Sequence, residues 1–145
     1  MRVDFYQLSQ STPEAVVPLL ARATLQAGER LLVVAEDEEL RSALSDALWA
    51  AYPDAFLANG DGGSEAASRQ PVLLSGDCEA ENAAQFILFA DGKWRDEAKS
   101  FARTLLVFGE DRLEDTRGVW RMLDEVEGAE RHFWKQEGGK WREGP

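Results

Sequence analysis

The spacing of apolar residues changes along this chain, and the changes predict alternating strands and helices. Residues 3–8 combine aromatic and β-branched side chains and predict a first strand. The continuous apolar run 31–35 predicts a second strand that is buried on both faces. Apolar residues recur at helical spacing over 16–27 and again over 40–51. This order of elements predicts an α/β domain with a largely parallel central sheet.

Local signals mark the ends of both helices. Ser11 followed three residues later by Glu14 predicts a capping box at the start of the first helix, and Gly28 predicts its end. Asp37 predicts the N-terminal cap of the second helix, and Pro53 predicts its end. Both helices are therefore expected to be self-contained units between strands.

Shorter patterns predict the remaining elements of the sheet. Strands are expected at 55–57, 71–74, 85–89 and 104–108, and a short helix is expected to begin near 94–99. Residues 59–69 are rich in Gly, Ser and Asp and predict a loop.

The last third of the chain predicts one long helix, from about Glu110 to Gly128. Its apolar residues recur at offsets of three and four, at positions 119, 122, 123 and 126, so one face is expected to lie on the core. Arg117 and Arg121 lie one helical turn apart, with Trp120 between them. Two guanidinium groups beside an indole suit a peptide that carries both a carboxylate and an aromatic side chain.

The same residues have a plainer interpretation. Exposed charges are the rule on helix surfaces, and Arg117 and Arg121 could pair with nearby acids such as Glu114, Asp124 and Glu125. From the residue pattern alone, a solvated helix flank is the favoured interpretation.

Charge narrows the possible partners. The length of 145 residues fits one domain over 1–145 with a real core, and the chain carries a net charge of -11. Residues 1–90 hold five Lys/Arg against 14 Asp/Glu, whereas residues 91–145 hold 11 against 13. The acidic balance disfavours direct binding of nucleic acid but allows a small basic patch in the last third. No apolar run is long enough for a membrane span, no secretory signal is visible, and the single Cys78 cannot form an internal disulfide. A cytoplasmic protein is expected.

The loops that follow the predicted strands lack recognisable catalytic chemistry. Residues 9–12 have no glycine for the close approach of a pyrophosphate, and Glu36–Glu39 would repel a nucleotide. Those four acids could hold a divalent cation, but stabilisation of a helix N-terminus is the favoured role. The Gly-rich segment 60–64 lacks a following Lys, and His132 has no Cys or Ser partner at a recognisable spacing. The sequence therefore predicts no catalytic residues, no metal and no cofactor.

Seven short blocks, in this order and spacing, carry a resemblance to a known family. They are Asp4–Leu8, Glu36–Glu38, Ala47–Leu57, Pro71–Leu74, Arg117–Arg121, Phe133–Gln136 and Gly139–Trp141. Over essentially its full length the chain resembles the chi subunits of bacterial DNA polymerase III holoenzyme. It departs from the family where Ala58 and Asn59 stand in place of a frequent Pro-His pair.

The resemblance implies a fold and a role. It implies a Rossmann-like three-layer domain with a long C-terminal helix, followed by a Trp-containing tail over 131–145. It also implies a non-catalytic accessory subunit of the clamp-loader assembly in DNA replication. Such subunits bind the acidic C-terminal tail of single-stranded DNA-binding protein (SSB) and join the clamp loader through the psi subunit.

The family's tail site matches Arg117, Trp120 and Arg121 here, with Arg112 as a further basic contact. Arg117 or Arg121 would take the terminal carboxylate of the tail, and Trp120 would wall a pocket for its terminal ring. Two alternatives stay open. One is a Rossmann-like nucleotide-binding or hydrolytic enzyme, and the other is a different binding module in which the last helix is purely structural.

Overall fold

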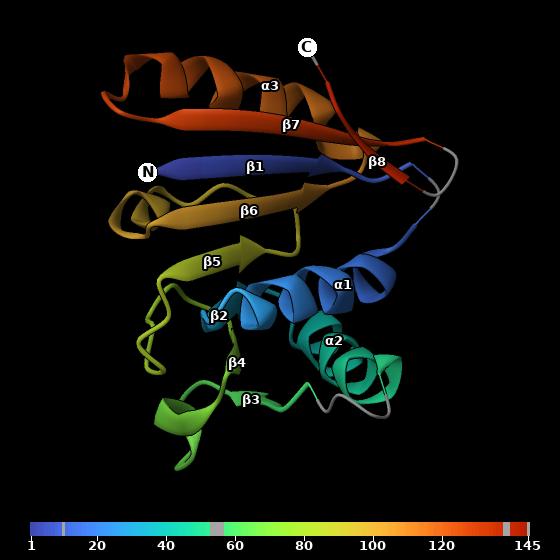
Figure 1. The fold of residues 1–145 in the computed structure, drawn as a ribbon, viewed down its shortest axis with the longest axis vertical. Coiled ribbons are helices and arrows are strands. Elements are labelled where there is room, and N and C mark those ends of the chain that lie inside the picture. Colours follow the sequence, from blue (N-terminus) through green and yellow to red (C-terminus); the bar gives the residue numbers. More distant parts are fainter. Residues whose placement is uncertain (10, 53–56, 138–139, 145) are drawn as a thin grey trace.

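A central sheet organises the chain. The computed structural model describes residues 1–9, 11–52, 57–137 and 140–144. In these residues eight strands form one sheet in the order β3-β4-β2-β5-β6-β1-β7-β8 (Figure 1). The strands are β1 (Arg2–Gln7), β2 (Leu31–Val34), β3 (Asn59–Asp61), β4 (Val72–Ser75), β5 (Phe86–Phe89), β6 (Arg103–Phe108), β7 (Glu130–Glu137) and β8 (Lys140–Glu143). Neighbouring strands pair in parallel except β7 and β8, which are antiparallel.

Helices lie on both faces of the sheet (Figure 1). The helices α1 (Pro13–Gln26) and α2 (Glu38–Ala51) cover one face, and α3 (Leu113–Met122) lies against β7 on the other. Short 3-10 helices occupy Ala67–Arg69, Asp96–Ser100, Glu110–Arg112 and Leu123–Glu125. The apolar strand β2 is fully buried between the two layers, as its unbroken run of Leu and Val predicts.

The predicted α/β class and largely parallel sheet are confirmed. The Rossmann-like arrangement stays a prediction, because the α3 face is covered by one ten-residue helix and several 3-10 turns. Asp37 caps α2 as predicted, since its side chain accepts a hydrogen bond from the Glu39 N–H at 3.0 Å.

The predicted capping box at Ser11 is wrong. Thr12 is the N-cap of α1, without a side-chain hydrogen bond to the helix. The Ser11 hydroxyl instead accepts a hydrogen bond from the side-chain amide of Gln136 at 2.9 Å, so a contact with β7 competes successfully with local capping.

The predicted loop over 59–69 is also wrong in part, because it contains β3 and a 3-10 turn. Asn59, the first residue of β3, is buried, but its polar side chain has hydrogen-bond partners. Its amide donates to the carbonyl of Leu57 at 2.9 Å and accepts from the Ser45 hydroxyl at 2.6 Å. Of the strand predicted at 55–57, residues 55 and 56 lie outside the described residues, and Leu57 is buried without strand structure.

The long C-terminal helix is wrong as one element. Only ten residues form α3, and a 3-10 turn precedes and follows it. The chain then turns at Gly128, whose φ of 79° suits glycine, and returns along the sheet as β7. Residues expected to form a tail are therefore largely strands. Trp134 and Trp141 pack against the core on the face that carries α1 and α2.

Candidate functional site

The site predicted on the last helix lies where α3 faces β7. Glu114 and Asp115 occupy the first turn of α3, where negative charge is favourable, and Arg121 lies in the last turn. On the inner side, Trp120 and Phe133 of β7 both pack against a core cluster that includes Phe5 of β1. Leu113, Val119 and Met122 of α3 pack against the same cluster, so aromatic and aliphatic side chains together anchor the helix to the sheet.

A cavity of about 210 Å³ opens between α3 and β7. Its lining residues are Thr116, Arg117, Trp120, Arg121 and Phe133. The structure therefore brings Arg117, Trp120 and Arg121 together, and it adds two residues that sequence reasoning missed.

Aromatic contacts fix the shape of the cavity. The Trp120 ring lies 5.1 Å from Phe5 and 6.1 Å from Phe133 between centroids, with tilted or edge-on geometry in both pairs. These are preferred arrangements for aromatic side chains. Arg131 of β7 adds a cation–π contact, with its guanidinium carbon 4.6 Å from the Trp120 ring centroid.

Both arginines of the cavity keep donors available for a ligand. The Arg117 side chain is 57% exposed, and its only ion pair among the described residues is with Glu114 at 3.5 Å. Glu114 is itself 89% exposed, so this pair contributes little stability. Arg121 is exposed and forms no ion pair or side-chain hydrogen bond within the described part of the chain. Their guanidinium groups can therefore bind a carboxylate without breaking a strong contact.

Arg112 lies elsewhere. It belongs to the 3-10 turn before α3, pairs with Asp115 at 3.4 Å and lines a different hollow, beside Gly109 and Phe108. The structure does not place it in the cavity with the other three predicted residues.

Thr116 forms the buried floor of the cavity. The residue is only 1% exposed, and its hydroxyl has no hydrogen-bond partner among the described residues. Helical spacing places Thr116 one turn before Trp120, which is the signal that could have identified it. Phe133 carried no such signal, because its place beside α3 follows from the pairing of β7 with β1.

Two larger hollows lie at the carboxyl ends of the parallel strands. One, about 580 Å³, is lined by the acids Glu38, Asp46, Asp61, Asp77 and Glu81, and among the described residues Arg41 is the one basic side chain in its lining. Such a lining disfavours phosphate groups. No group of three or more His, Cys, Asp or Glu that could hold a metal is found in the part of the chain described.

Asp91 lines the second hollow, of about 540 Å³, but is engaged internally. Arg95 donates to both its oxygens, at 2.9 and 2.8 Å, and the Glu36 N–H donates at 3.0 Å. Burial acts to raise the pKa of Asp91, but these hydrogen bonds outweigh it and hold the pKa below its ordinary value. This carboxylate is therefore a charged structural group and a poor candidate for a general base.

Comparison with known protein families assigns the chain to one of them. The family model described as DNA polymerase III chi subunit, HolC, matches residues 1–129. The chain belongs to this chi subunit family. The resemblance drawn from the sequence is thereby confirmed, and it places the protein among the accessory subunits of DNA polymerase III.

The match includes all of α3 but ends before β7, so four of the five cavity-lining residues lie inside it and Phe133 lies outside. A search of curated proteins found no match. Each helix among the described residues is too short or too polar to cross a membrane.

Proposed function

We propose that this chi-family subunit binds the acidic C-terminal tail of SSB in the cavity between α3 and β7. In this role it couples SSB-coated template to the clamp loader, through the psi subunit. The observation that supports the proposal is the lining of the cavity, which combines two available guanidinium groups with two aromatic walls.

The chemistry of such a tail complements this lining. The tail of SSB, the partner of this family, carries several Asp residues and ends in Pro-Phe with a free carboxylate. Arg117 or Arg121 takes the terminal carboxylate in a bidentate pair, and the terminal ring lies against Trp120 and Phe133. The other arginine attracts the Asp residues and speeds the encounter.

The affinity is expected to be modest and sensitive to salt. One ring and one carboxylate are a small contact, which corresponds to a Kd of roughly micromolar. The arginines are exposed, so salt screens their attraction for the tail. The net charge of -11 of the chain opposes an acidic peptide everywhere except near such a local patch.

A structural role of Trp120 does not exclude a binding role. Trp120 is partly buried and contacts Phe5 in the core, yet it also lines the cavity. Substitutions of the two arginines test binding separately from folding, because both side chains line the cavity but are exposed and contribute little to folding.

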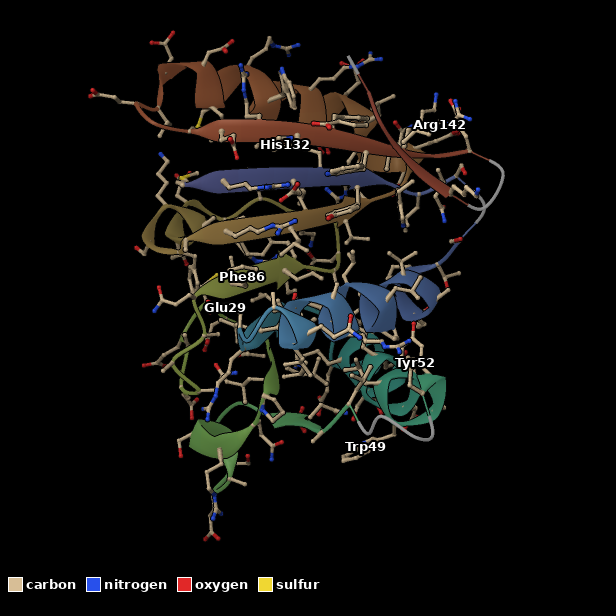
Figure 2. All side chains as sticks on the ribbon, viewed as in Figure 1. Glu29, Trp49, Tyr52, Phe86, His132 and Arg142 are labelled. Carbon is tan, nitrogen blue, oxygen red and sulfur yellow. The ribbon has the colours of Figure 1, made fainter. Side chains whose placement is uncertain are left out.

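The test is a fluorescence-anisotropy titration with a labelled acidic peptide ending in Asp-Ile-Pro-Phe. The same peptide without its last Phe is the ligand control. Arg142→Ala is the protein control, because Arg142 is an exposed arginine on β8 outside the cavity (Figure 2). We expect micromolar binding that is strongly weakened, but still measurable, on removal of the Phe, is also strongly weakened in Arg117→Ala or Arg121→Ala, and is kept in Arg142→Ala. Absence of binding at low salt would refute the proposed site.

A further inference from the structure

Arg131, on the neighbouring strand β7, contacts both the ring and the backbone of Trp120. The Arg131 guanidinium carbon lies 4.6 Å from the indole centroid, so the planar group covers the ring. Its Nη1 donates to the Trp120 carbonyl at 2.6 Å, and its Nη2 pairs with Asp124 Oδ1 at 2.6 Å. One guanidinium group thus contacts the ring and the backbone of Trp120 and an acid in the 3-10 turn that follows α3.

The backbone contact satisfies a group that the helix leaves free. The last four carbonyls of an α-helix have no partner within the helix, and Trp120 belongs to the last turn of α3. A cation at this end is also favoured by the helix dipole. Arg131 therefore stabilises the turn that carries the aromatic wall of the cavity.

Arg131 differs from the two arginines that line the cavity. Its side chain is 23% exposed, against 57% for Arg117, and it is not among the lining residues. Asp124 neutralises its charge at contact distance. Arg131 is thus poorly placed to attract an acidic peptide from solution and well placed to fix the orientation of Trp120.

We propose that Arg131 is a positioning residue that sets the selectivity of the cavity for an aromatic C-terminal residue. The inference rests on the proposed function. By clamping the indole between its own guanidinium and the rings of Phe5 and Phe133, Arg131 keeps the wall ready for a second ring. Without it, part of the binding free energy is spent on ordering Trp120.

The readout is a ratio of two affinities. For each variant, the Kd of the peptide that lacks its terminal Phe is divided by the Kd of the full peptide. An aromatic pair contributes about 1 kcal/mol, which corresponds to about a fivefold change in affinity. We expect Arg131→Ala to weaken the full peptide about fivefold and the truncated peptide less than about twofold.

Two further variants separate stacking from charge and from the ion pair. Arg131→Lys keeps the charge but has no planar group to cover the ring, so the ratio should fall nearly as far as in Arg131→Ala. Asp124→Asn keeps the stacked guanidinium, so the ratio should stay close to that of the wild type. Arg142→Ala again serves as the control, and all titrations are run below the onset of thermal unfolding of each variant.

The possible outcomes distinguish a failure of the inference about Arg131 from a failure of the proposed function. A ratio that is unchanged in both Arg131→Ala and Arg131→Lys, in a wild type that does discriminate between the peptides, overturns the inference alone. An equal loss for both peptides also overturns it, because that result indicates a general loss of folding or charge. A wild-type protein that binds neither peptide overturns the proposed function and the inference together.

Discussion

Asp4 offers a quantitative test of how the sheet holds β7 in place. Its carboxylate lies in the middle of β1, is 0% exposed, and accepts hydrogen bonds from residues of three strands. Arg2 donates to both its oxygens at 3.1 Å, Arg103 of β6 donates at 2.7 Å, and the Trp134 indole of β7 donates at 2.9 Å. This one side chain ties β6, β1 and β7 together.

Asp4→Asn keeps the size of the side chain but removes its charge and one acceptor oxygen. Of the four contacts, the two at the replaced oxygen are lost, and an amide N–H then faces a donor. A hydrogen bond to a charged group contributes about 1.5–3 kcal/mol. The arginine side chains are 36% and 28% exposed and can turn toward water, which favours the lower end of that range. We expect Asp4→Asn to lower the free energy of unfolding by about 3 kcal/mol.

The measurement is urea unfolding at pH 7 with linear extrapolation to water. The matched control is Asp115→Asn, an exposed acid in a single 3.4 Å pair, which should change the free energy by less than about 0.5 kcal/mol. A loss below about 1 kcal/mol in Asp4→Asn would refute the reasoning, since both arginines would then be solvated at little cost. Asp4 faces away from α3, so the folded variant should bind the peptide with unchanged affinity.

Three further changes test the site and its surroundings. Trp120→Ala removes a partly buried ring in contact with Phe5, so it should lower the free energy of unfolding by about 2–3 kcal/mol in urea and also abolish peptide binding; a loss of only one of the two would contradict the dual role. Thr116→Val replaces a buried hydroxyl that has no partner among the described residues, and it should raise the free energy of unfolding by about 1 kcal/mol, whereas a decrease would show that the hydroxyl is hydrogen-bonded. His132 has its pKa raised by a hydrogen bond to Glu143 and by the nearby carboxylate of Glu130, so its stabilising effect is present below about pH 6.5 and is lost as pH rises through the raised pKa. The difference in urea midpoint between wild type and His132→Gln should therefore shrink from pH 5.5 to pH 8, and a constant difference would contradict the assignment.

Local patterns predicted the elements whose residues interact mainly with their sequence neighbours. The apolar run at β2 and the Asp37 cap of α2 depend on burial and on contacts a few residues away, so the sequence alone was sufficient for both. The start of α1 shows where prediction from local patterns stops working. Ser11 has the right chemistry for a cap, but its hydroxyl bonds to Gln136, which is 125 residues away.

The prediction of one long helix in the last third of the chain was wrong for a related reason. Apolar residues at offsets of three and four continue to Val126, and this spacing cannot distinguish an α-helix from an α-helix that ends in a 3-10 turn. The true end of α3 follows from the return of the chain at Gly128 to pair β7 with β1, which is a long-range contact. That pairing also brings Phe133 and Arg131 to Trp120, so no spacing on α3 could have revealed them.

The insertion of β7 beside β1 therefore determines whether the cavity exists. On an isolated α3, Arg117 and Arg121 would be two exposed charges on a helix of ten residues, too short to be stable alone. Beside β7, the same helix gains the wall of Phe133 and the clamp of Arg131 on Trp120. Asp4 secures that strand through Trp134 from the opposite face of the sheet. Binding at the cavity and stability of the β1–β7 pairing are thus expected to be coupled, and a peptide that binds only the assembled site should stabilise β7 against local unfolding.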